Sequence, residues 1–91
     1  MANIHIKRNH RLGIENARAE VEKLARSLRS ELQVDYGWTG NTLEFTRSGA
    51  SGTIDVGADY IDLEIDLRLP LSLMKVAIEQ SINNRLDAAL G

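Results

Sequence analysis

Residues 60–68 constrain the fold more than any other segment, because apolar and acidic side chains alternate along them without a break. The apolar set is Ile61, Leu63, Ile65 and Leu67, and the acidic set is Asp62, Glu64 and Asp66. Successive side chains of a strand point to opposite faces of the sheet, so this segment predicts a sheet with one buried face and one open face. The carboxylates of the open face argue against binding to phosphates or acidic lipid.

A long helix is predicted after a short first strand, in which Ile4 and Ile6 alternate with polar residues. Between Gly13 and Leu32 the apolar residues recur every three or four positions, the spacing of one helix face. They are Ile14, Ala17, Val21, Leu24, Ala25, Leu28 and Leu32. The opposite face carries glutamates and basic residues at i,i+3 or i,i+4 spacing, which indicates a solvated surface.

Three more strands precede the segment 60–68. Residues 34–39 and 42–46 alternate around a Gly40-Asn41 turn and predict a hairpin. After a turn rich in serine and glycine, a short strand is expected at 54–56.

A second helix is predicted at the end of the chain. Pro70 ends the last strand, and Ser72 is the expected N-cap of a helix that runs to about Leu90. One side of this helix is apolar and is expected to pack on the sheet. It comprises Leu71, Met74, Ile78, Ile82, Leu86 and Ala89.

Leu73, Val76 and Ala77 project away from that packing side, next to Leu69 and Pro70. Exposed apolar groups that cluster in this way mark interfaces, although scattered exposed apolar residues are ordinary. We therefore predict an interaction patch at Leu73, Val76 and Ala77.

The predicted order is β-α-β-β-β-β-α in a single α+β domain, residues 1–91. Both helices are expected on one face of a curved antiparallel sheet, as in TATA-box-binding-protein-like or reduced helix-grip topologies. Similarity at the level of the fold indicates no activity. A chain of this length has room for one core but not for a large internal cavity.

Composition excludes several kinds of chemistry. The chain has no cysteine, which rules out disulfides, thiolate catalysis and cysteine-ligated metal. A net charge of -2 gives no electrostatic footprint for nucleic acid. No apolar run reaches the length of a signal peptide or a membrane span, so we expect a cytoplasmic protein with no membrane span.

The groups that could carry acid-base or metal chemistry each have a simpler structural interpretation. His5 and His10 lack a metal-ligand spacing, so we expect His5 to face water and His10 to bond to the backbone where the chain enters the helix. The strand carboxylates could pair as acid and base or hold calcium, but nothing in the sequence predicts a pocket wall that would desolvate them. These carboxylates are Asp55, Asp62, Glu64 and Asp66. We predict no catalytic residue, no metal site and no cofactor.

Trp38, Tyr36 and Phe45 could form a stacking platform for bases or a sugar, yet they share the strand face of Val34 and Leu43. Core packing is therefore the favoured interpretation of the aromatic residues. Five arginines follow the end of the first strand and the first helix with glutamates between them, which favours a salt-bridged surface over an anion site. They are Arg8, Arg11, Arg18, Arg26 and Arg29.

Five stretches, in order along nearly the whole chain, share their pattern with a known family. They are Ile4-His5-Ile6-x-Arg8-x-His10-x-Leu12-Gly13, Ala17-Arg18, Tyr36-x-Trp38-x-Gly40-x-x-Leu43-x-Phe45, Gly49-x-x-Gly52-x-Ile54-x-Val56 and Ile78-Glu79-x-x-Ile82-x-x-x-Leu86-Asp87. On these motifs the chain resembles the polyhydroxyalkanoic acid system proteins, short bacterial proteins associated with storage-polyester granule regions.

The resemblance implies a small, non-catalytic accessory protein tied to polyhydroxyalkanoate metabolism, and it brings no active site to transfer. Arg8, His10, Arg18 and Trp38 are motif positions. We expect them to anchor strands to helices and to fill the core, ahead of a role in ligand binding.

Three functions stay open at this point. The first is an interaction protein that recognises a granule surface or a granule protein through the patch, or forms a homodimer through the patch or an unpaired sheet edge. The second is a small-molecule module in which the sheet and the C-terminal helix grip an acyl or hydroxyacyl group beside Trp38. The third, an enzyme acting on a thioester, ranks last because no desolvated acid-base pair is evident.

Overall fold

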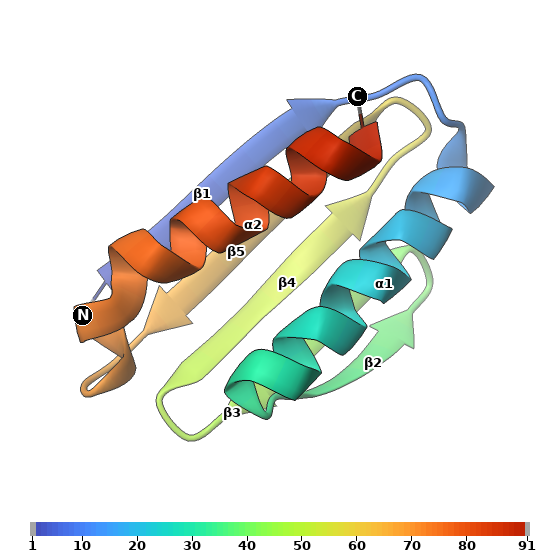
Figure 1. Cartoon of the computed structure of the whole chain (residues 1–91). Coiled ribbons are helices and arrows are strands. Elements are labelled where there is room, and N and C mark those ends of the chain that lie inside the picture. The colour runs from blue at the N-terminus through green and yellow to red at the C-terminus, as the bar shows by residue number, and fades with distance from the viewer. Residues whose placement is uncertain (1, 91) are drawn as a thin grey trace.

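The chain forms a five-stranded sheet with two helices on one face (Figure 1). The computed structural model describes residues 2–90. In chain order the elements are β1 (Ala2–Asn9), α1 (Ile14–Leu32), β2 (Asp35–Thr39), β3 (Thr42–Arg47), β4 (Ala50–Val56), β5 (Tyr60–Leu67), the 3-10 helix η1 (Leu71–Met74) and α2 (Lys75–Leu90). No helix within residues 2–90 has both the length and the apolar character needed to cross a membrane.

The strands lie in the order β1-β5-β4-β3-β2, and every neighbouring pair is antiparallel. The first strand of the chain therefore pairs with the last one, and β2 forms the opposite edge. Helix α1 packs over β4 and β2, whereas α2 packs over β1 (Figure 1). This arrangement confirms the predicted α+β class, the order of the elements and the antiparallel sheet.

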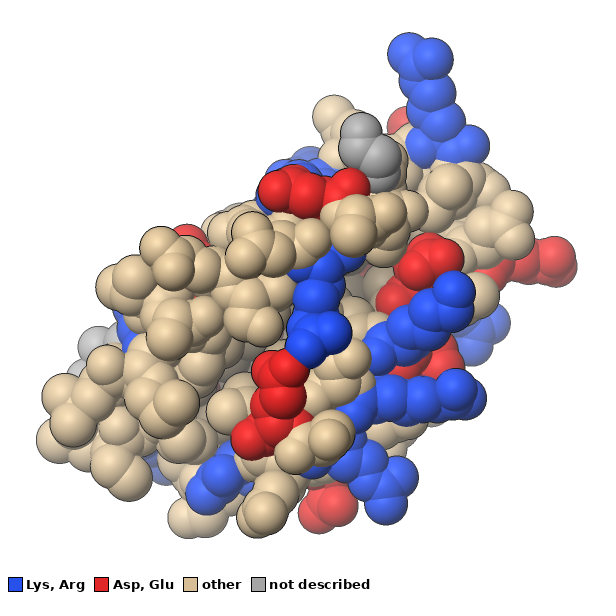
Figure 2. Space-filling model, in the orientation of Figure 1, with Lys and Arg blue, Asp and Glu red and all other residues tan. Residues whose placement is uncertain are grey.

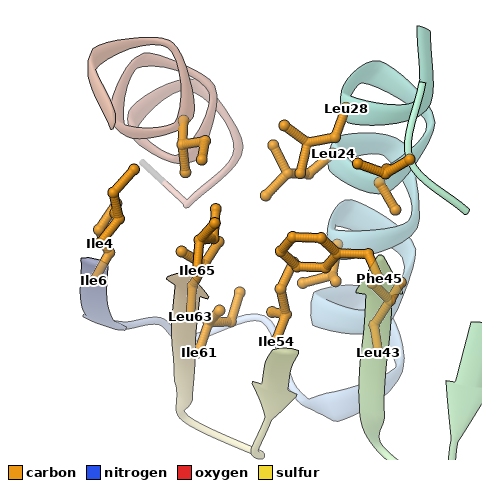
Figure 3. Close-up of a cluster of buried hydrophobic side chains, with 14 of the residues drawn as sticks. Ile4, Ile6, Leu24, Leu28, Leu43, Phe45, Ile54, Ile61, Leu63 and Ile65 are labelled. Carbon is orange, nitrogen blue, oxygen red and sulfur yellow. The ribbon is translucent and has the colours of Figure 1, made fainter. Parts of the chain in front are cut away.

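The core lies between the sheet and the two helices (Figure 3). Strand β5 behaves as its alternation predicts, because its four apolar residues are buried while the acidic residues between them lie on the other face. Ile4 and Ile6 of β1 and Leu24 and Leu28 of α1 join the same cluster. Full burial of one such side chain stabilises the fold by about 1.5–3 kcal/mol, so the alternation determines which face of β5 is inside.

Gly52 in β4 makes room for the Phe45 ring on the neighbouring strand. The two residues are direct partners in the β3–β4 ladder, and both face the helices. A Cβ atom at position 52 would lie 2.7 Å from Cζ of Phe45 and would also collide with the Glu64 carbonyl. The glycine is therefore required by the packing of Phe45, although the sequence suggested only that it belonged to a turn.

The start of the second helix differs from the prediction. Ser72 lies inside η1, and α2 begins only at Lys75, so Ser72 is not the N-cap of the α-helix. Met74, which was expected to pack on the sheet, is exposed, while Leu71, Ile78, Ile82 and Leu86 are buried as predicted. Residues 71–74 form a separate 3-10 turn, so a projection that treats residues 71–90 as one continuous α-helix does not apply to Met74.

Candidate functional site

An apolar patch covers the segment that joins β5 to α2. It consists of Leu69, Leu73, Met74, Val76 and Ala77, and all five are exposed. Leu73 is 80% exposed, Leu69 71%, Val76 67% and Met74 48%. Figure 2 shows a broad uncharged area at this end of the molecule. This apolar patch contains the predicted residues Leu73, Val76 and Ala77, and adds Leu69 and Met74 to them.

The backbone beneath the apolar patch is held by hydrogen bonds. The amide of Ser72 donates to the Arg68 carbonyl at 3.0 Å, and the amide of Leu73 donates to the Pro70 carbonyl at 3.1 Å. The backbone amide of Arg68 in turn donates to the carbonyl of Gly49 at 2.8 Å. Leu71, between the exposed residues, is buried and anchors η1 to the core. The apolar side chains are thus presented by an ordered turn, which lowers the entropy cost of docking.

Arg8 joins the edge strand β1 to the second helix. Its guanidinium donates to Oδ1 of Asp87 at 2.7 Å and to Oδ1 of Asn83 at 2.9 Å. Both partners lie on the face of α2 nearest to β1. The anchoring role expected for Arg8 therefore has a direct geometric basis.

His10 bonds to the backbone where the chain leaves β1, as predicted. The side chain is buried, and its Nε2 donates to the carbonyls of Gly57 at 3.1 Å and Tyr60 at 3.2 Å, while Nδ1 accepts from the amide of Leu12 at 3.2 Å. These contacts use both ring nitrogens and fix the tautomer with the proton on Nε2. His10 therefore holds the β4–β5 turn against the segment that leads into α1.

Trp38 and Arg18 belong to a polar cluster between β2 and α1. Glu22 accepts hydrogen bonds from the Tyr36 hydroxyl at 2.6 Å and from the Trp38 indole at 3.0 Å, and Arg26 pairs with it at 3.1 Å. The Arg18 guanidinium stacks on the Trp38 ring, 4.6 Å from its centroid. The hydrogen bonds from Tyr36 and Trp38, helped by the charge of Arg26, lower the pKa of Glu22.

Sequence reasoning missed the part that Glu22 plays in this cluster. Its spacing to Arg26 suggested an ordinary surface pair, whereas the carboxylate is half-buried and connects α1 to two aromatic residues of β2. Trp38 itself is half-buried against the core, in line with the packing interpretation. It lies beside α1, at the edge of the sheet opposite to β1 and α2, so the sheet and the C-terminal helix do not enclose it.

A groove runs between the two helices. Leu24 and Leu86 form its apolar floor, and Lys23 and Arg85 stand at its rim. Its volume is about 400 Å³. Arg85 bridges the helices by donating to Ser27 at 3.1 Å and pairing with Glu31. Figure 2 shows the hollow next to the ion pair that crosses between the helices.

The open face of the sheet carries the predicted carboxylates. Asp55, Glu64 and Asp66 are exposed and Asp62 is half-buried, with both helices on the other face. His5 also lies on the open face, as expected, with Nε2 2.6 Å from Oδ1 of Asp62 and 3.8 Å from Oε1 of Glu64. The proximity of His5 to Asp62 and Glu64 could not be predicted from the sequence, because it results from the pairing of β1 with β5.

One of three comparisons with known proteins found a match, to a sequence model of a protein family. A sequence model of the family described as "Putative polyhydroxyalkanoic acid system protein" matches residues 4–90. The match spans both helices and all but the first two residues of β1. Searches of curated proteins and of solved structures found no significant match.

Proposed function

The chain belongs to the polyhydroxyalkanoic acid system protein family, and from that premise we propose that it is a non-catalytic accessory protein that docks on polyhydroxyalkanoate granules in the cytoplasm. Its apolar patch supplies the contact, with the polyester surface or with a protein on it. The observation that carries the proposal is the exposure of Leu69, Leu73, Met74 and Val76 side by side at one end of the fold.

The chemistry of the partner suits this patch. A polyhydroxyalkanoate is a polyester, with apolar chains and ester carbonyls but no repeated charge. Burying a large apolar side chain gains about 1.5–3 kcal/mol, so four side chains that are 48–80% exposed offer about 4–8 kcal/mol on docking. Association itself costs about 4–15 kcal/mol, which favours weak, reversible attachment of single molecules.

The contacts of two polar motif residues, Arg8 and His10, and of Glu22 support a binding role over a catalytic one. Each of the three forms side-chain hydrogen bonds that join one element to another. A general acid or base needs a free group within reach of a substrate. These three residues instead stabilise the fold that presents the apolar patch.

Co-sedimentation with purified polyester granules tests the proposal. Wild-type protein should pellet with the granules, and Leu73→Asp should reduce the bound fraction at least tenfold, because a charge would have to enter the apolar contact. Asn84→Asp is the matched control, since it adds the same charge at an exposed site of α2 outside the apolar patch. Circular dichroism must show that both variants are folded. Equal pelleting of the wild type and Leu73→Asp would overturn the proposal.

A second candidate function is supported by the interhelical groove. Its volume lies within the range of small-molecule sites, and the apolar floor between Lys23 and Arg85 would suit the alkyl chain and carboxylate of a hydroxy acid. Titration with 3-hydroxy acids should then shift the methyl NMR signals of Leu24 and Leu86. Unchanged signals at millimolar ligand would dismiss this function.

A homodimer through the apolar patch is the remaining alternative. Sedimentation velocity over a range of protein concentrations tests it directly. Dimers that disappear in Leu73→Asp would assign the patch to self-association, and a monomer at all concentrations would leave it free for the granule.

A further inference from the structure

Three potential metal ligands converge on the open face of the sheet, away from the apolar patch. His5 stands directly opposite Glu64 in the β1–β5 ladder, and Asp62 lies two residues from Glu64 on the same face. One ligand atom from each residue lies within 4.8 Å of the other two. All three side chains project from paired strands, so the backbone that carries them is rigid.

Carboxylates crowd around these three residues, and the ion-pairing partner that Asp62 and Glu64 share is the imidazole of His5. Asp55 stands directly opposite Asp62 on the next strand, and like charges at opposed positions destabilise a sheet. Lys7 is the ladder partner of Asp62, yet its ammonium lies over the Tyr60 ring, 5.6 Å from the centroid. Within residues 2–90 no ion pair joins Lys7 to Asp62. A bound cation would relieve this repulsion.

We propose that His5, Asp62 and Glu64 form a binding site for a divalent transition-metal ion, with Zn²⁺ as the best-fitting member of that class. One imidazole and two carboxylates are a ligand set that Zn²⁺ accepts in proteins, whereas Mg²⁺ and Ca²⁺ take oxygen ligands almost alone.

The side chains lie near the spacing that this assignment needs. Ligand atoms about 2.1 Å from a tetrahedral ion are separated by about 3.4 Å from one another. His5 Nε2 lies 3.8 Å from Oε1 of Glu64 and 2.6 Å from Oδ1 of Asp62, and the second contact is a hydrogen bond that the ion would replace. Small side-chain rotations would admit the ion between the three groups. Because His5 is exposed, water would complete the coordination.

Calorimetric titration of Zn²⁺ into the full chain, prepared without a polyhistidine tag, tests the site. One ion should bind per chain, and His5→Ala and Asp62→Asn should each weaken the affinity at least about tenfold. Asp66→Asn is the matched control, because it removes an equal charge from the same open face outside the proposed site. The affinity of Asp66→Asn for Zn²⁺ should stay within about twofold of the wild-type value. Added Mg²⁺ should not displace Zn²⁺ from the wild-type protein.

The two histidines provide an internal reporter for the same titration. The ring NMR signals of His5 should shift with Zn²⁺, while those of His10, whose ring nitrogens are occupied, should not. Unchanged Zn²⁺ affinity in His5→Ala would overturn the proposal. An equal loss in Asp66→Asn and Asp62→Asn would also overturn it, by showing that the acidic face attracts cations without a defined site.

Discussion

Replacing Glu22 with alanine is expected to destabilise the fold by about 2–3 kcal/mol, an unusually large effect for a residue on the outer side of a helix. The carboxylate accepts hydrogen bonds from Tyr36 at 2.6 Å and Trp38 at 3.0 Å. Each hydrogen bond to a charged group contributes about 1.5–3 kcal/mol when shielded from water. Two such bonds would sum to about 3–6 kcal/mol, and the remaining solvent exposure of Glu22 reduces the expected loss to about 2–3 kcal/mol. The whole domain is stabilised by only about 5–14 kcal/mol.

Urea denaturation followed by circular dichroism measures this loss. With a urea dependence of about 1–3 kcal/mol per molar, the midpoint should fall by roughly 1 M or more. Glu20→Ala is a close control, because the Glu20 side chain is 29% exposed and that of Glu22 is 28%. The partner of Glu20 is Lys23, a surface ion pair worth about 0.2–1 kcal/mol. Equal midpoints for the two variants would refute the role given to the Glu22 cluster.

The lowered pKa of Glu22 adds a pH dependence with a defined sign. A carboxyl group whose pKa is lower in the folded state stabilises the protein above its unfolded pKa, about 4.3 for glutamate. That contribution disappears as the pH falls through the folded value. The wild type should therefore exceed Glu22→Ala in unfolding free energy by the full predicted amount at pH 6. This difference should become smaller below about pH 4.

Two further substitutions test the faces of the sheet and its packing. Ile65→Asp should prevent folding at room temperature, because it places an unpaired carboxylate in the core, whereas Glu64→Gln in metal-free protein should change the unfolding free energy by less than about 0.5 kcal/mol. If Ile65→Asp melted at a higher temperature than Glu64→Gln, the assignment of the buried and open faces of the sheet would be reversed. Gly52→Ala should cost about 1–3 kcal/mol by forcing the Glu64 carbonyl and the Phe45 ring to shift, and a melting temperature equal to that of the wild type would contradict this packing.

The periodicity of the sequence predicted the order of the long helices and the strands and most of their buried faces, but it missed η1 and the first residues of β4. The four apolar residues of β5 can all be buried only if the strand turns one face to the helices; they are Ile61, Leu63, Ile65 and Leu67. In the same way, the apolar residues of α1 lie along one side of the helix, so only that side can pack on the sheet. Leu73 and Val76 are exposed, as predicted. Their use as a binding surface stays a prediction.

Contacts between distant elements could not be predicted, because periodicity assigns a residue to a face but not to a neighbour. Arg8 meets Asp87 only because α2 folds back over β1, and His5 meets Asp62 only because the first strand pairs with the fifth. Met74 was misplaced for a local reason. The segment before α2 is a separate 3-10 helix, so the projection of one continuous α-helix did not hold for Met74.

Binding to a clean polyester film, measured as an isotherm with the wild type and Val76→Asp, tests the central claim most directly. If the apolar patch makes the contact, the wild type should bind reversibly with an affinity that does not weaken from low to high salt, because burial of apolar surface is not screened. Val76→Asp should bind at least tenfold more weakly. Equal binding by Val76→Asp, or wild-type binding that is lost in salt, would show that the apolar patch is not the docking surface.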